Sequence, residues 1–97
     1  MNNQVIEEIL VFKGGQICIA KSVDNELMQV IKDILPAIEN WMELTLEELC
    51  GDEYWSSKTD GERRTLGRYF AYLVDKGLMP FEFANSCCQT PKRYRLK

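Results

Sequence analysis

The chain has 97 residues, enough for one domain with a single modest core, and its content of 45% apolar and 28% charged residues is ordinary for a globular protein. No apolar run approaches the roughly 20 residues that span a bilayer, and the N-terminal segment lacks the basic start of a signal peptide. We therefore expect one cytoplasmic domain, residues 1–97, without a membrane segment.

Charge divides the chain into two unlike parts. Residues 1–60 hold four lysines against twelve acidic residues, a net charge of −8, whereas residues 61–97 hold eight basic against three acidic residues, a net charge of +5. Such asymmetry is typical of proteins whose basic part has an anionic partner. The acidic part could discourage unspecific binding or form an interface of its own.

Residue types needed for most catalytic and metal sites are missing. The chain has no histidine and none of its four cysteines is spaced C-x-x-C, which excludes mixed zinc sites. No phosphate loop, dinucleotide fingerprint or nucleophile elbow is found. We expect a non-enzymatic protein with no cofactor, no metal and free thiols. The cysteines are Cys18, Cys50, Cys87 and Cys88.

Residues 5–22 contain two short apolar runs on either side of KGGQ. Paired glycines supply the positive φ angles of a tight turn, so a β-hairpin is favoured. A short helix ending at Gly14 is the alternative.

A helical pattern follows, starting at Asp24 or Asn25 as the cap. Pro36 is expected to kink this helix, or to begin a second helix in the same direction, because proline lacks a backbone donor. The residues spaced for its core stripe are Leu27, Ile31, Ile34, Leu35, Ile38, Trp41 and Met42.

A second helix is predicted from Thr45 to Gly51. Thr45 is its N-cap, Glu48 stands at the capping-box position and Gly51 ends it. Residues 52–60 read as a loop whose Tyr54 and Trp55 fold back on the core. An exposed binding surface is the alternative for these two aromatic residues.

A longer helix is expected to begin at Thr59 or Asp60 and to end at Gly77. Arg64 and Arg68 lie one turn apart on its polar side, and Gly67 would let another backbone come close. Its apolar arc consists of Leu66, Tyr69, Phe70, Leu73 and Val74.

The chain ends in a second predicted hairpin. FEFA and KRYRLK both alternate apolar and polar residues, and residues 85–91 between them are rich in turn formers. Phe81 and Phe83 should therefore pair with Tyr94 and Leu96.

The order short helix, turn, longer helix and hairpin resembles a winged helix-turn-helix. The resemblance covers residues 45–97, carried by TLEELCG, DGERRTLGRYFAYLVDKGLM and PKRYRLK, and the linker GDEYWSSKTDG is longer than the usual tight turn. This region is also similar to a small uncharacterised bacterial domain with Trp, Arg, Leu-Gly and Phe in that order. We expect an α+β fold with an N-terminal hairpin and kinked helix in residues 1–44 and a winged-helix-like half in residues 45–97.

In winged-helix proteins the second helix enters the major groove and the wing contacts the backbone or minor groove. The resemblance therefore implies double-stranded DNA as partner and a role in transcription regulation. The base-facing candidates are Arg63, Arg64 and Arg68, and the phosphate-facing candidates are Lys92, Arg93 and Arg95. The alternative is that Arg64 and Arg68 only solvate the helix, paired with Glu62 or Asp75.

A second functional alternative is a protein-interaction module or inhibitor acting through the acidic N-terminal half. The same half is expected to form a homodimer through residues 5–42, because one thin helical layer leaves apolar surface and strand edges uncovered.

Overall fold

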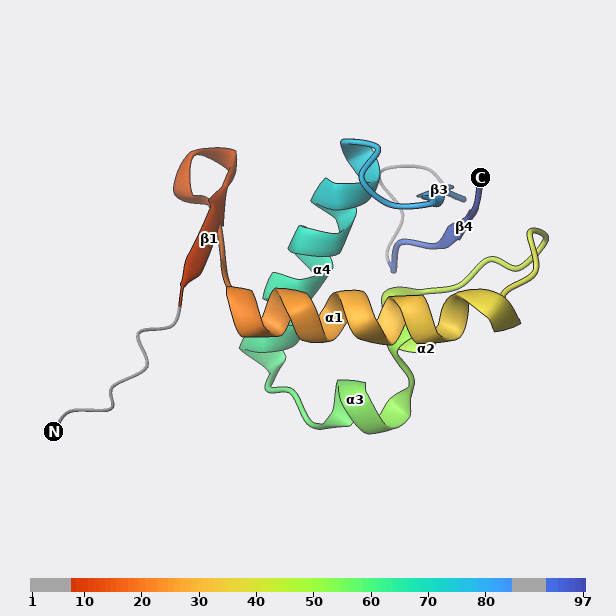
Figure 1. Ribbon diagram of the computed structural model, residues 1–97, viewed down its shortest axis with the longest axis horizontal. Coiled ribbons are helices and arrows are strands. Elements are labelled where there is room, and N and C mark those ends of the chain that lie inside the picture. The colour runs from red at the N-terminus through yellow and green to blue at the C-terminus, as the bar shows by residue number, and fades with distance from the viewer. Residues whose placement is uncertain (1–7, 85–90) are drawn as a thin grey trace, which may run out of the picture.

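The computed structural model describes residues 8–84 and 91–97. These residues form an α+β domain with a hairpin near each end and helices between them, as expected from the sequence (Figure 1). The elements are β1 Ile9–Phe12, β2 Ile17–Ala20, α1 Lys21–Ile34, α2 Leu46–Cys50, α3 Asp52–Ser56, α4 Asp60–Asp75, β3 Phe81–Phe83 and β4 Tyr94–Leu96.

The N-terminal hairpin is confirmed, and the alternative of a helix ending at Gly14 is wrong. β1 pairs antiparallel with β2 from Ile9 opposite Ala20 to Phe12 opposite Ile17. The connection takes positive φ angles at Lys13, Gly14 and Gly15, which glycine adopts without strain. The first expected strand residues, 5–7, lie outside the described residues.

Helix α1 begins earlier than the sequence pattern indicated. The backbone N–H of Lys21 donates to the Glu8 carbonyl oxygen at 2.8 Å, so the hairpin itself supplies the helix start. Asp24 and Asn25 are therefore not caps. The Asp24 carboxylate instead accepts a hydrogen bond from the Tyr69 hydroxyl of α4.

Helix α1 also ends earlier than expected. Pro36 lies in a single 3₁₀ turn at Leu35–Ala37, after which Ile38 is extended at φ −93° and ψ 126°. The predicted continuation past Pro36 is therefore limited to this one turn, which directly follows α1. Ile38 stays buried, but the change of periodicity turns Trp41 outward, where it is 72% exposed rather than part of the core.

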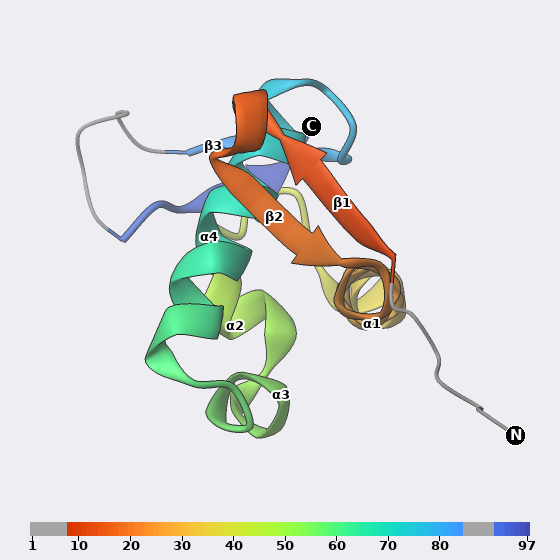
Figure 2. The same ribbon diagram turned by 90° about the vertical axis from the view of Figure 1, so that its left-hand side faces the viewer.

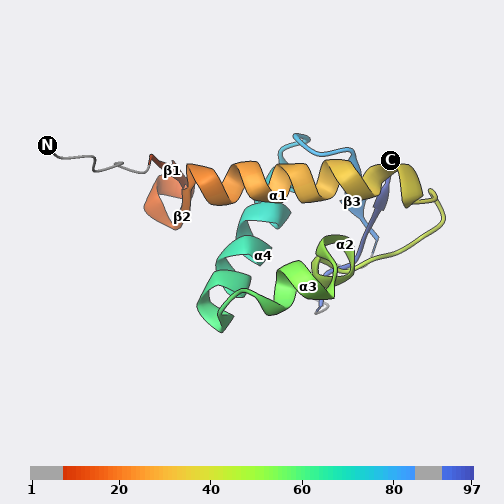
Figure 3. The same ribbon diagram turned by 60° about the horizontal axis from the view of Figure 1, so that its bottom comes forward.

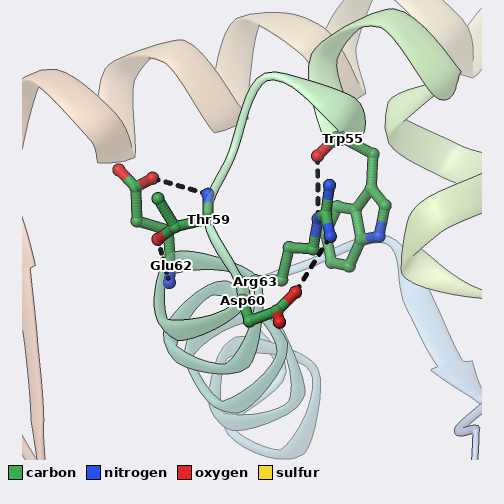
Figure 4. Close-up of polar contacts among 5 residues, drawn as sticks. All are labelled: Trp55, Thr59, Asp60, Glu62 and Arg63. Carbon is green, nitrogen blue, oxygen red and sulfur yellow. Dashed lines mark hydrogen bonds and ion pairs between the residues drawn. The ribbon is translucent and has the colours of Figure 1, made fainter.

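The start signals of α2 and α4 are confirmed. Thr45 forms a capping box with Glu48, with N···O distances of 2.9 and 3.2 Å. Thr59 forms one with Glu62, with distances of 2.8 and 3.2 Å (Figure 4). Hydrogen bonds from the cap backbone lower the pKa of both glutamates. A cap of this kind contributes about 1 kcal/mol to helix stability.

The predicted loop after Gly51 is wrong in part, because residues 52–56 form helix α3. Gly51, at φ 85°, turns the chain between α2 and α3. Two acidic residues follow in the first turn of α3, where the helix dipole favours negative charge. Tyr54 and Trp55 are half-buried against the core, as expected.

Helix α3 is held against α1 by the residue that follows it. Lys58 Nζ lies 3.1 Å from Glu26 Oε1 of α1 and 4.8 Å from the centre of the Tyr54 ring. Burial, together with the nearby Glu26 charge, raises the pKa of Tyr54 to about 12. These contacts fix the position of α3, and with it Trp55.

Helix α4 lies between the two hairpins and across α1 (Figures 1 and 3). Its five predicted apolar-arc residues are all buried. On one side the Phe12 ring lies 5.2 Å from the ring of Tyr69, and on the other the Phe70 ring lies 5.8 Å from Phe81 and 4.7 Å from Tyr94. Figure 2 shows the β1–β2 hairpin crossing in front of α4, which it contacts through β2.

The C-terminal hairpin is confirmed with the predicted partners. Phe81 pairs with Leu96, and Phe83 with Tyr94. The sequence did not predict a further pairing, in which Leu44 and Tyr94 exchange two backbone hydrogen bonds of 2.8 Å each. β4 therefore lies between β3 and the segment that precedes α2. Most of the predicted connection, residues 85–90, lies outside the described residues.

Candidate functional site

A pocket of about 770 Å³ lies where the start of α2, the polar side of α4 and the segment before β4 meet. We call it the basic pocket, because it brings together five of the six residues predicted to contact DNA. Its lining is Thr45, Leu46, Glu47, Glu48, Trp55, Arg63, Arg64, Gly67, Arg68, Pro91, Lys92, Arg93 and Tyr94. Five cationic and two anionic side chains thus border one cavity.

Arg64 and Arg68 are the exposed members on α4. They stand one helical turn apart, with Gly67 on the same wall. The expectation that Gly67 admits another backbone is wrong, since a Cβ built there would meet nothing within 4 Å. Because Gly67 has no side chain, the pocket is open between Arg64 and Arg68.

Arg63 is held in place by its neighbours. Its Nε donates to the Trp55 carbonyl oxygen at 3.0 Å, and its Nη1 lies 3.1 Å from Asp60 Oδ1 (Figure 4). Its side chain is only 33% exposed. The residue ties α3 to the first turn of α4, so we regard it as a positioning residue for Trp55 and α4.

The segment before β4 brings Lys92 and Arg93 to the opposite wall. Arg93 Nη1 lies 3.9 Å from Glu48 Oε1 and donates to the Glu43 carbonyl oxygen at 3.5 Å. Arg95 does not reach this pocket. Its Nε lies 2.7 Å from Glu82 Oε2, its partner across the β3–β4 ladder.

The structure also brings two lysines that the sequence analysis missed, Lys13 and Lys76, close to the Tyr72 ring of α4. Lys13 and Gln16, in the turn of the first hairpin, line a depression of about 450 Å³ together with Ile17 and Arg68. Lys13 Nζ lies 5.8 Å from the centre of the Tyr72 ring, and Lys76 Nζ lies at the same distance. No local pattern around Gly14 could have linked this turn to α4.

The thiols within the described residues lie apart from the basic pocket. Burial raises the pKa of Cys50 to about 12, whereas Cys18 is exposed on β2. Cys87 and Cys88 lie outside the described residues. Within 8–84 and 91–97 no three Cys, Asp or Glu residues are grouped to hold a metal ion, and no helix is both long and apolar enough to cross a bilayer.

The fold and the pocket define a small α+β domain with a basic concave surface between a helix and a hairpin. The chain belongs to the family described as a domain of unknown function, DUF1413, whose pattern matches residues 29–95. All residues that line the basic pocket fall inside this match, and the first hairpin falls outside it. No curated protein and no solved structure matches the chain.

Proposed function

We propose that this chain is a non-enzymatic DNA-binding domain of the winged-helix kind, acting as a regulator on double-stranded DNA. In this proposal α4 is the recognition helix and β3 with β4 is the wing. The order of α2, α3, α4 and the hairpin supports it, although α3 replaces the tight turn of a usual helix-turn-helix.

The observation that carries the proposal is the convergence of basic side chains from two distant segments. Arg64 and Arg68 come from α4, and Lys92 comes from the segment before β4, yet all three line the basic pocket. Proteins neutralise DNA phosphates with such lysine and arginine clusters. Arginine also binds the O6 and N7 atoms of guanine with two hydrogen bonds.

Different roles follow from the different partners of these residues. Arg64 and Arg68 are exposed on the helix and are therefore the candidates for base edges. Lys92 and Arg93 lie at the wing side and are the candidates for phosphates. Arg63 and Arg95 each face a carboxylate of the same domain, at 3.1 and 2.7 Å, so neither is assigned a DNA contact, and Arg63 would hold the start of α4 in place.

Duplex binding should depend steeply on salt. Two phosphate contacts, from Lys92 and Arg93, predict a slope near −1.8 in a plot of log affinity against log salt, and an affinity loss of about tenfold between roughly 50 and 200 mM salt. Fluorescence anisotropy with a labelled random-sequence duplex measures this slope.

Lys32→Ala is the matched control, because Lys32 is an exposed cation on α1 and does not line the basic pocket. It should leave the slope unchanged, whereas Lys92→Ala should reduce its magnitude by about one. Absence of duplex binding at about 50 mM salt would remove the DNA proposal.

The second candidate is self-association through the N-terminal half, within residues 5–42. The observation in its favour is exposed apolar surface: Ile9 is 53%, Val11 58% and Trp41 72% exposed. Ile9 and Val11 share the outward face of β1, whose opposite face contributes to the core. Exposed apolar side chains on a strand edge are typical of surfaces that pair with another chain.

Val11→Glu should therefore convert a two-chain species into a single chain. Because Val11 is largely exposed, the fold should survive, with an unchanged circular dichroism spectrum and a shift of unfolding free energy within about 0.5 kcal/mol. Light scattering at micromolar concentration measures the mass. A wild-type mass of one chain would exclude the homodimer, and Lys32→Ala serves again as the control.

A further inference from the structure

The basic pocket combines its charges with an aromatic and apolar wall. Trp55 is half-buried and lines the pocket from α3, alongside Leu46, Pro91 and Tyr94. The backbone of Trp55 is fixed from two sides, by the Arg63 bond to its carbonyl oxygen and by the anchoring of α3 on α1. The part of the chain that carries the indole is therefore held in place before any ligand arrives.

A base pair inside a duplex cannot stack on this aromatic wall. Within a duplex the bases present their edges to the grooves while their faces are occupied by neighbouring bases. A base outside the stack offers an apolar face to an aromatic side chain and brings its own phosphate with it. Arginine and lysine beside an aromatic surface are the groups that proteins use for unpaired nucleotides.

We propose that the basic pocket receives one unpaired nucleotide, with the base against Trp55 and its phosphate toward Arg64, Arg68 and Lys92. This inference rests on the proposed function and names the ligand of the same site: on an unpaired nucleotide Arg64 and Arg68 bind the phosphate, whereas on a paired duplex they face base edges. The pocket volume of about 770 Å³ lies within the roughly 300–1,000 Å³ that is usual for small-molecule sites. This is more than one nucleotide needs, so the strand has room to enter and leave.

The acidic residues that line the basic pocket set the orientation of the bound nucleotide. Glu47 and Glu48 belong to α2, so a phosphate is repelled from that side of the pocket and drawn toward α4. Arg93, 3.9 Å from Glu48, neutralises part of this charge. A glutamate-rich peptide would gain from the same cations but would have no aromatic ring to stack on Trp55, which is why a nucleotide is favoured.

The test compares two duplexes with the same number of base pairs, one fully paired and one with a single bulged nucleotide and therefore one more phosphate. Trp41→Phe protein leaves Trp55 as the one indole, since the chain has two tryptophans. The bulged duplex should bind about tenfold more tightly and should quench Trp55 fluorescence, as stacking on one aromatic residue predicts. The fully paired duplex should bind without quenching.

A second comparison separates the role of Trp55 from general folding. In the otherwise wild-type protein, Trp55→Ala should abolish the preference for the bulged duplex, measured by anisotropy, and keep the affinity for the paired one. Trp55→Phe retains a flat ring and should retain most of the preference. Both variants are compared with wild type by circular dichroism before titration.

The outcomes distinguish this inference from the proposal on which it rests. Equal affinities and no quenching would overturn the nucleotide pocket and leave duplex binding standing. Failure of both duplexes to bind at about 50 mM salt would remove both. If a free deoxynucleoside monophosphate bound as tightly as the bulged duplex, the ligand would be a free nucleotide and the assignment to nucleic acid would be wrong. Equal quenching by a glutamate-rich peptide would also overturn it.

Discussion

Replacing Phe70 by alanine is expected to lower the free energy of unfolding by about 3–5 kcal/mol. Phe70 is 0% exposed and its ring contacts Phe81 and Tyr94, so the deletion removes the packing between α4 and the C-terminal hairpin. Domains of this size are stable by only about 5–15 kcal/mol, so the substitution removes a large share of the total stability. Urea unfolding followed by circular dichroism measures the loss.

Phe83→Ala is the matched control for this prediction. Phe83 also contacts Tyr94, with ring centres 5.5 Å apart, but it is 36% exposed and leaves no closed cavity when truncated. It should cost about 1 kcal/mol, the centre of the range for single substitutions. Equal losses for both variants would mean that the hairpin is not anchored through Phe70.

Replacing Arg64 and Arg68 together by alanine is expected to weaken duplex binding by about a hundredfold. Each arginine that contacts a base contributes about 1–3 kcal/mol, and each 1.4 kcal/mol corresponds to a factor of ten. Both residues are exposed, so the unfolding free energy should change by less than about 0.5 kcal/mol. Anisotropy at fixed salt, with urea unfolding alongside, separates binding from stability.

Arg95→Ala is the control for this pair, because it removes the same kind of charge outside the basic pocket. Its partner is Glu82 at 2.7 Å, and both side chains are more than two-fifths exposed, so the ion pair is worth at most about 1 kcal/mol. DNA affinity should stay within about twofold of wild type, because Arg95 does not line the basic pocket. A hundredfold loss with Arg95→Ala would show that the DNA path follows the hairpin rather than the pocket.

Features that depend on contacts between residues close together in the chain could be predicted without the structure. Both capping boxes need only a threonine and a glutamate three residues apart, and both form. The apolar arc of α4 follows from helical spacing, and all its members are buried. The partners in β3 and β4 follow from the alternation of apolar and polar residues. In each case the determining contacts lie within one or two turns or one hairpin.

Contacts between distant segments decided the rest. Helix α1 starts at Lys21 because the backbone of Glu8, thirteen residues away, accepts its N–H. Residues 52–56 were predicted as a loop from their composition, yet they form α3, which Lys58 anchors to Glu26 of α1. Trp41 belongs to the predicted helical stripe, but the helical segment ends at Ala37, after the 3₁₀ turn that contains Pro36, and Trp41 is 72% exposed.

The same distinction between local and long-range contacts applies to the candidate site. The sequence identified the basic residues, since charge is a property of each residue alone. Their surroundings follow from the packing of distant segments. Arg64, Arg68 and Lys92 face one cavity, of which Trp55 lines another wall. Arg63 and Arg95 instead face carboxylates. The physical reason is that these distances are set by the packing of α4 against both hairpins, and no spacing along the chain encodes that packing.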